Sequence, residues 1–282
     1  MTGKTIVVTG ASSGVGQATA RELALLGARV VMINRGGPKA DATLKELQKA
    51  LGPDRVEMLT GDLSSQTSVR EVAAKFLESH DRLDVLVNNA GMIFPSREVT
   101  FDGLERTFAL NHLGYFLLTE LLLDLLKKSA PARIVNVASE AHRMVKGMNF
   151  DDLQSAKSYH PWNAYGQSKL ANILFTRELA RRLEGTGVTA NSLHPGFVST
   201  GFGRDLTGMH RFVLGLLRPF AMISPQQGAR TPVYLASSPQ VEGLSGRYYI
   251  KRRPASPSPA ARDDAAARRL WEVSVQLTRP IV

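Results

Sequence analysis

The sequence predicts an α/β fold built on a doubly wound parallel sheet, and three observations support this. Apolar runs alternate along the chain with stretches of helical periodicity, which is typical of βαβ units. Each apolar run is nearly continuous, as expected for strands that are covered by helices on both faces. A glycine-rich segment joins the first apolar run to the first helical stretch, as in folds whose first strand turns tightly into a helix.

The expected elements follow one another in chain order. Strands are expected at residues 4–9, 28–33, 55–60, 83–88, 132–138, 187–193 and 245–250. Helices are expected at residues 15–26, 39–51, 65–78, 101–127, 163–184 and 226–236. Because crossovers between parallel strands are right-handed, about seven strands should lie in the order 3-2-1-4-5-6-7, with helices on both faces. The length of 282 residues suits one domain spanning residues 1–282.

Two segments, residues 140–164 and 197–225, interrupt this alternation. Long insertions at the carboxyl ends of strands lie over the ligand crevice of such folds. Residues 197–225 are rich in Phe, Leu and Met, so we expect them to form an apolar lid over the substrate, although they would also suit a subunit interface. A Pro/Ser linker and a last helix should make up residues 254–282. That helix has one apolar stripe of Ala267, Leu270, Trp271 and Val275.

The composition excludes several classes of protein. The chain is 43% hydrophobic and 21% charged, as is ordinary for soluble globular proteins. It has no cysteine, which excludes a disulfide scaffold, a thiolate metal site and a cysteine nucleophile. The six histidines show no metal-ligand spacing, so no metal is expected. No uninterrupted apolar run reaches about 18 residues, and Met1 leads directly into the first strand, so we expect a cytoplasmic protein without a spanning helix.

Half of the net charge of +10 lies near the end of the chain, because residues 247–282 carry eight Lys or Arg against three Asp or Glu. Such a segment suits a solvated surface, and contact with nucleic acid or anionic lipid is the alternative. It contains no recognisable nucleic-acid-binding motif. We therefore expect no nucleic-acid partner, while peripheral membrane contact stays open.

The glycine-rich segment is Thr9-Gly-Ala-Ser-Ser-Gly-Val-Gly16. A strand, a glycine turn and a helix in this order predict a dinucleotide site. Gly10 permits the tight turn, while Gly14 and Gly16 allow a pyrophosphate to approach the backbone. The exposed N–H groups and the helix dipole attract its phosphates. The alternative is a plain strand-to-helix connection. The candidate residues are Gly10, Ser12, Ser13, Gly14, Val15 and Gly16.

Tyr165 and Lys169 are four residues apart and therefore lie on one face of the same expected helix. The unperturbed pKa of a phenol is about 10. An ammonium fixed beside it favours the phenolate, so we expect Lys169 to lower the pKa of Tyr165 towards neutral pH, as a general acid or base requires. On its own the spacing is also compatible with an aromatic residue beside a solvated charge.

The end of the second strand indicates which nucleotide is bound. NAD-dependent enzymes place an acidic residue about 20 positions beyond the glycine turn, on the ribose 2′-hydroxyl. In this chain Asn34 takes that place, and Arg35 offers a planar guanidinium that suits a 2′-phosphate. The alternative for Arg35 is a solvated charge at the strand end. We predict NADP(H) as the cofactor.

These motifs together resemble the short-chain dehydrogenase/reductases. The glycine turn matches that family's Thr-Gly-x-x-x-Gly-x-Gly, and Tyr165 and Lys169 match its Tyr-x-x-x-Lys. Further matches stand in the expected order, at Asp62-Leu63, Asn88-Asn-Ala-Gly91, Asn111, Ser139 and Pro195-Gly196. The resemblance covers essentially the whole chain, implies a Rossmann-like fold, and is strongest to the retinol-dehydrogenase-like branch.

The resemblance also implies roles for individual residues. Tyr165 would be the general acid and base, and Lys169 would lower its pKa and hold the nicotinamide ribose. Ser139 would hydrogen-bond the substrate oxygen, and Asn111 would hold a water that connects Lys169 to solvent. Asn88 would also steady the central strand, while capping or turn formation are the alternatives for Ser139, Asn111 and Asp62. The remaining cofactor-binding residues would be Asp62, Leu63, Asn88, Ala90, Gly91, Pro195, Gly196, Val198 and Thr200.

We therefore expect an NADP(H)-dependent oxidoreductase that interconverts a carbonyl and an alcohol on a lipophilic substrate, such as a retinoid, a steroid or an aliphatic aldehyde or ketone. The alternative is a non-catalytic NADP(H)-sensing or partner-binding protein on the same fold. A homodimer or homotetramer is possible, because the helices at 101–127 and 163–184 resemble the family's usual dimer faces.

Overall fold

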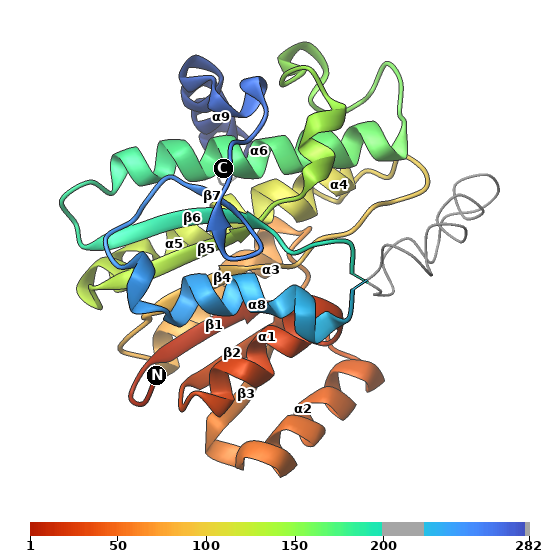
Figure 1. Cartoon of the computed structure of the whole chain (residues 1–282). Helices are drawn as coiled ribbons and strands as arrows, with labels where there is room; N and C mark the ends of the chain where they lie inside the picture. The colour runs from red at the N-terminus through yellow and green to blue at the C-terminus, as the bar shows by residue number, and fades with distance from the viewer. Residues whose placement is uncertain (199–222, 280–282) are drawn as a thin grey trace.

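The structure is a computed structural model that describes residues 1–198 and 223–279. Within these residues one sheet holds eight strands in the order β3-β2-β1-β4-β5-β6-β7-β8 (Figure 1). The predicted order 3-2-1-4-5-6-7 is confirmed for the parallel part, and β8 pairs antiparallel with β7 at the edge. The strands are β1 (Thr5–Thr9), β2 (Arg29–Asn34), β3 (Val56–Thr60), β4 (Val85–Asn88), β5 (Ala132–Val137), β6 (Val188–His194), β7 (Tyr248–Ile250) and β8 (Arg253–Pro254).

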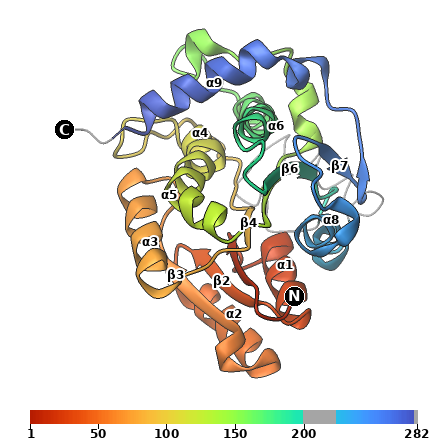
Figure 2. The same cartoon turned by 90° about the vertical axis from the view of Figure 1, so that its left-hand side faces the viewer.

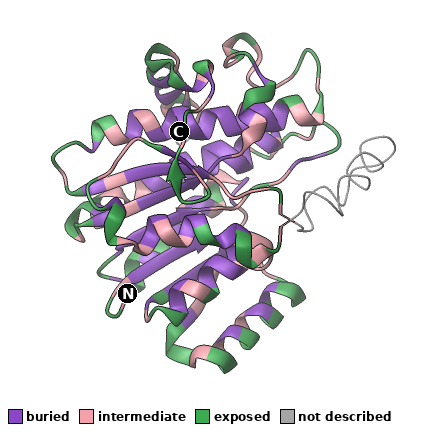
Figure 3. Ribbon diagram, viewed as in Figure 1, coloured by how far each residue is buried: buried purple, intermediate pink, exposed green. Residues whose placement is uncertain are grey.

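Helices cover both faces of the sheet, and Figure 2 shows α3 and α5 on one side with α1 and α8 on the other. In β1, Ile6 and Val8 pack in the core under α1 and α8, whereas Val7 packs in the core under α3, α5 and α6. Because both faces are covered, β1, β2, β4, β5 and β6 are mostly buried, whereas β3 is largely half-buried and β8 is exposed (Figure 3). The helices are α1 (Gly14–Leu25), α2 (Pro38–Leu51), α3 (Gln66–Ser79), α5 (Gly114–Lys128), α6 (Pro161–Arg182) and α8 (Pro225–Ser237).

The helix predicted at 101–127 begins later than expected. Residues 99–105 form a turn closed by a bridge between Val99 and Glu105, and Gly103 takes a positive φ of 75°. The carboxylate of Glu105 then accepts hydrogen bonds from the N–H groups of Thr107 and Phe108 at 2.7 and 2.8 Å, which caps α4 (Arg106–Phe108). A π-helical turn at Ala109–Leu113 joins α4 to α5.

The continuous helical stretch Arg106–Lys128 is long and apolar enough to cross a membrane, which differs from the sequence expectation. However, 72% of its apolar window is buried inside the fold. That degree of burial is typical of a core helix, and the stretch contributes Tyr115, Phe116 and Leu118 to the core under α3 and α6.

The last helix, α9 (Asp264–Leu277), packs along α6, as Figure 2 shows. The expected apolar stripe is confirmed: Ala267, Leu270 and Trp271 are buried and Val275 packs against the core. The preceding linker is held to the sheet, because β8 pairs with β7 and the Ala255 N–H donates to the Tyr248 carbonyl at 2.8 Å. Most of the lid expected at residues 197–225 lies outside the described residues.

Candidate active site

The glycine turn has the conformation that its residues predict. Gly10 and Gly14 have φ values of +66° and +59°, where side chains are rarely accommodated. A Cβ at Gly10 would lie 2.8 Å from the Cα of Ala90, and one at Gly16 would overlap the Gly10 carbonyl. α1 starts at Gly14, and no side chain caps it at Ser13. The turn is therefore a cradle of backbone N–H groups that fits a pyrophosphate.

Thr9 and Asn89 hold this turn against the end of β4. The Thr9 hydroxyl accepts hydrogen bonds from the N–H groups of Asn89 and Ala90 at 2.8 and 2.9 Å. The Asn89 amide in turn donates to the Thr9 carbonyl at 2.8 Å. These contacts fix Ala90 beside Gly10, as expected for two residues of one nucleotide site. Neither Thr9 nor Asn89 was among the predicted site residues, although both lie inside the motifs that were recognised.

Asn34 ends β2 and Arg35 follows it, beside the glycine turn. Asn34 is buried and its Oδ1 accepts a hydrogen bond from the Ser12 N–H at 2.9 Å, which ties β2 to the glycine turn. Its Nδ2 is buried without a partner among the described residues. Arg35 is exposed and makes no ion pair within that part of the chain. The exposed guanidinium of Arg35 suits an anionic group, whereas the Asn34 amide nitrogen is closed off from solvent.

Asp62 and Leu63 are predicted to bind the adenosine end of the cofactor, and both also make contacts within the protein. Asp62 Oδ1 accepts hydrogen bonds from the N–H and the hydroxyl of Ser64 at 2.9 and 2.7 Å, so that oxygen supports the turn after β3. The Leu63 carbonyl lies against Gly114, where a Cβ would overlap it.

The side chain of Asn88 points into the core. It is fully buried and its amide donates to Thr119 and Asn136 at 3.0 and 2.9 Å. Those contacts connect β4 to α5 and β5, as the steadying role predicted for Asn88 requires, while its contact with the nucleotide stays a prediction. Strand-end position alone could not distinguish the two, because they depend on which way the side chain points.

Tyr165 and Lys169 lie together in α6. The ammonium nitrogen of Lys169 is 5.4 Å from the centre of the Tyr165 ring and 5.7 Å from that of Tyr115, which the sequence did not single out. Lys169 is buried, and its Nζ donates to the Val137 carbonyl at 3.1 Å. The two side chains therefore share one side of the helix, as their spacing predicts.

The predicted effect of Lys169 on Tyr165 is not what the structure shows. Burial raises the pKa of Tyr165 above its usual range, and a hydrogen bond with Ser139 only partly offsets this. Burial also lowers the pKa of Lys169 to about 7. The sequence interpretation assumed a fixed ammonium and overlooked desolvation, which disfavours the charged form of both groups.

Ser139 and Asn111 approach the same pair from two other elements. Ser139 follows β5 and caps the 3₁₀ turn at Glu140–Met144, accepting a hydrogen bond from the Ala141 N–H at 3.2 Å. Asn111 lies in the π-helical turn and is held by the backbone of Met92, with Oδ1 accepting at 2.8 Å and Nδ2 donating at 2.9 Å. π-turns inside helices occur frequently at functional sites.

Gly91 separates Asn111 from Lys169. A Cβ at this glycine would lie 3.2 Å from both Asn111 Oδ1 and Lys169 Nζ. Any side chain here would therefore fill the space between the amide oxygen and the ammonium. The predicted water, held by Asn111 and connecting Lys169 to solvent, would need that space.

The segment after β6 returns to the nucleotide turn. Gly196 has a φ of +102°, and Val198 pairs with Ile223. The side chains of Val198 and Val15 both lie against Gly228 of α8, at 2.7 and 3.0 Å from where a Cβ would be. Pro195 precedes this contact, and the predicted Thr200 lies outside the described residues.

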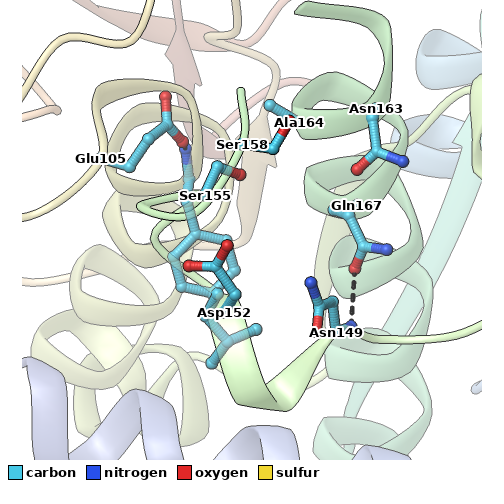
Figure 4. A pocket seen from close by; sticks show the side chains of 10 residues that line it. Glu105, Asn149, Asp152, Ser155, Ser158, Asn163, Ala164 and Gln167 are labelled. Carbon is cyan, nitrogen blue, oxygen red and sulfur yellow. Dashed lines mark hydrogen bonds between the residues drawn. The ribbon is translucent and has the colours of Figure 1, made fainter. Parts of the chain in front are cut away.

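A separate cavity near the start of α6 is not the reactive site. Its volume is about 30 Å³, enough for about two water molecules. Figure 4 shows Asn163 and Gln167 on the α6 side, with Asp152 and Glu105 on the opposite wall. Neither Tyr165 nor Lys169 lines it. The described residues hold no group of three or more His, Asp or Glu that could bind a metal.

Known proteins resemble this chain in sequence and in fold. A family model described as short chain dehydrogenase matches residues 4–210. The chain is 48% identical to retinol dehydrogenase 14 of Homo sapiens, over 97% of this chain and 86% of that protein. An uncharacterised protein from Mycobacterium paratuberculosis has a TM-score of 0.79 at 37% identity, over 98% of this chain and 94% of that one. RhlG of Pseudomonas aeruginosa, solved as an NADP active-site complex, has a TM-score of 0.71 at 28% identity, covering 88% and 94%.

The family match extends over most of the chain and includes the nucleotide turn and the tyrosine–lysine pair. Identity to the curated relative is high over nearly the full length. This protein therefore belongs to the short-chain dehydrogenase family of nicotinamide-dependent oxidoreductases.

Proposed function

We propose that this protein is an NADP(H)-dependent oxidoreductase that interconverts a carbonyl and an alcohol on a lipophilic, retinoid-like substrate. The observation that carries the proposal is the meeting of Tyr165, Ser139 and Lys169 at the carboxyl end of β5. The nucleotide, held by the glycine turn and the start of α1, would supply or accept the hydride.

Tyr165 is suited to give a proton in the reductive direction. Because burial raises its pKa, the phenol keeps its proton at neutral pH, and this form can protonate the carbonyl oxygen as that oxygen gains charge. The hydroxyl of Ser139, which already hydrogen-bonds Tyr165, would donate to the same oxygen.

Lys169 is suited to replace the proton that Tyr165 loses. Its pKa of about 7 means that the amine and ammonium forms coexist near neutral pH. A group poised in this way takes up a proton from solvent and releases it to a neighbouring phenolate at small cost. The space beside Gly91 and Asn111 would be the route by which water reaches it.

The preference for NADP(H) is supported by Asn34 and Arg35. The exposed Arg35 guanidinium offers donors to a 2′-phosphate, and Asn34 stands where a carboxylate would repel one. The relative RhlG, which was solved with NADP, supports the same choice.

Two observations support a lipophilic substrate: the activity named for the relatives, and exposed apolar side chains next to the site. The curated relatives are retinol dehydrogenases. Met144, in the turn that Ser139 caps, and Phe197, after Pro195-Gly196, are 60% and 43% exposed. Exposed apolar side chains beside a polar reactive centre suit a substrate with a hydrocarbon body.

The test is an NADPH-oxidation assay with all-trans-retinal and a panel of apolar aldehydes and ketones. We expect turnover by the unmodified protein and a loss of about 10³-fold in Tyr165→Phe, which removes the proton donor. NADPH binding, measured by fluorescence titration, should persist in the variant. Tight NADPH binding without turnover of any substrate would favour the non-catalytic sensor instead.

We also propose a cytoplasmic location with peripheral membrane contact, and a homodimer or homotetramer. The basic segment at residues 247–282 is the support for contact with an anionic surface. Fractionation of cells at low and high salt tests the location, since peripheral contact should be released by salt. Light scattering tests the oligomeric state.

A further inference from the structure

A buried polar contact joins the C-terminal helix to the turn that carries Asn111. Nε2 of His112 lies 2.8 Å from the hydroxyl oxygen of Ser274 in α9, and neither residue is exposed at all. The imidazole is otherwise surrounded by rings, with the centres of Phe108 and Phe175 at 5.0 and 5.9 Å. Burial lowers the pKa of His112 to about 3, so the ring is neutral at neutral pH.

Asn172 makes a second buried contact, and this residue connects the surroundings of His112 with those of Lys169. Asn172, one turn beyond Lys169 in α6, is fully buried, and its Nδ2 donates to the Val137 carbonyl at 3.3 Å. The same carbonyl accepts the hydrogen bond from Lys169 Nζ at 3.1 Å. Asn172 and Lys169 therefore share one acceptor, and a movement of either changes the position available to the other.

Two unsatisfied atoms lie between these contacts. Nδ1 of His112 and Oδ1 of Asn172 are both buried, and neither makes a hydrogen bond of good geometry within the described residues. The Asn172 side chain is nevertheless near enough to His112 to act on it as a hydrogen-bonding group. Buried polar atoms are rarely left unpaired, because desolvation is then uncompensated.

The tautomer of His112 decides whether those atoms are satisfied. If Nε2 carries the proton, it donates to Ser274, whose hydroxyl donates onward to the Leu270 carbonyl at 2.7 Å, and Nδ1 and Oδ1 face each other as two acceptors. If Nδ1 carries the proton, it donates to Asn172 Oδ1, while the Ser274 hydroxyl turns its single proton from the Leu270 carbonyl to Nε2. The second arrangement pairs both orphaned atoms.

We propose that His112, as the Nδ1–H tautomer, is a positioning residue that links Ser274 of α9 to Asn172 and thereby holds Lys169 in place. The effect on turnover rests on the proposed function, because it needs Lys169 to serve the reaction. The tautomer itself does not depend on any activity.

The tautomer is tested by nitrogen-15 NMR of the full-length protein labelled at histidine, with the His112 signals identified by their absence in His112→Gln. We expect a neutral imidazole with its proton on Nδ1. Replacing Asn172 with Ala should move the proton to Nε2, because only Ser274 then remains as a partner. A wild-type ring protonated on Nε2 would overturn the proposal.

The effect of His112 on Lys169 is tested with two variants, of which one keeps the hydrogen bond to Asn172 and the other keeps the hydrogen bond to Ser274. His112→Asn can place an amide where Nδ1 was and still donate to Asn172, whereas His112→Gln can reach only towards Ser274. We expect kcat for the best substrate of the assay above to fall about tenfold in the Gln variant, with KM for NADPH within about twofold, and to be largely kept in the Asn variant.

A purely packing role predicts the opposite order, because Gln fills the histidine site better than Asn does. Equal effects of the two variants, or a larger loss in the Asn variant, would therefore refute the positioning role. If the unmodified protein turns over none of the substrates, the proposed function fails while the NMR result still decides the tautomer. The NMR measurement on the unmodified protein also decides it if the variants do not fold.

Discussion

At the scale of single residues, the buried ammonium of Lys169 should have a measurable effect on stability. Its pKa in the folded protein is about 7, against 10.5 in water. The unfolded chain therefore binds more protons between these two values, and stability rises with pH across that window. Below about pH 7 the full cost of charging the buried amine is present, on the order of 5 kcal/mol at most.

Replacing Lys169 with Met should therefore increase the free energy of unfolding at pH 6, and the gain should shrink as pH rises towards 10. Urea denaturation at several pH values measures this. Lys45→Met, at an exposed position of α2, is the matched control and should show no such trend. A gain that is constant with pH would contradict the lowered pKa of Lys169.

Arg35 should decide the choice between the two nucleotides. Arg35→Asp removes a guanidinium and adds a charge that repels a 2′-phosphate, so KM for NADPH should rise about thirtyfold while KM for NADH changes little. Arg21→Asp, on the exposed side of α1, makes the same change in net charge and controls for long-range effects. A similar rise in both variants would mean that Arg35 does not contact the phosphate.

Among the elements, the segment that follows β4 and the π-helical turn that carries Asn111 meet at Gly91. Together they form one wall of the reactive site. Gly91→Ala would place a methyl group 3.2 Å from both Asn111 Oδ1 and Lys169 Nζ. We expect a loss of kcat of about tenfold with little change in Tm, because the space is filled without straining the backbone. Gly147→Ala has open space around its Cβ and should leave kcat unchanged.

Most element boundaries could be predicted, because the signals that set them are local in the sequence. The strands and α1, α2, α3, α6 and α8 lie within a few residues of the predicted ranges, because hydrophobic periodicity and glycine report local geometry. The start of the helix predicted at residue 101 was wrong. Glu105 caps the helix through its side chain, an unusual choice that helix-start patterns of Ser, Thr, Asp and Asn do not reveal.

At the scale of the whole molecule, α9 completes the core on the outer side of α6. The Trp271 ring lies 5.0 Å from that of Phe116 and 5.9 Å from that of Phe175, and the Arg182 guanidinium lies 4.3 Å from its centre. Trp271→Ala should lower the free energy of unfolding by about 3–5 kcal/mol, as measured by urea denaturation.

Arg268→Ala, on the exposed face of the same helix, is its control and should change stability by less than about 0.5 kcal/mol. A comparable effect of the two changes would mean that α9 frays from the body in solution. A large effect of Trp271→Ala alone would establish that residues 264–277 fold together with the sheet.

Local properties of the chain were enough to predict the strand order, the nucleotide turn and the pairing of Tyr165 with Lys169 on one helix face, because these follow from strand periodicity, positive-φ glycines and helical spacing. The folded arrangement was needed to establish that the Asn88 side chain faces the core, that burial raises the pKa of Tyr165 and lowers that of Lys169, and that Ser274 meets His112 from 162 positions away. Those outcomes depend on desolvation and on contacts between distant segments, and neither is written in the spacing of residues along the chain.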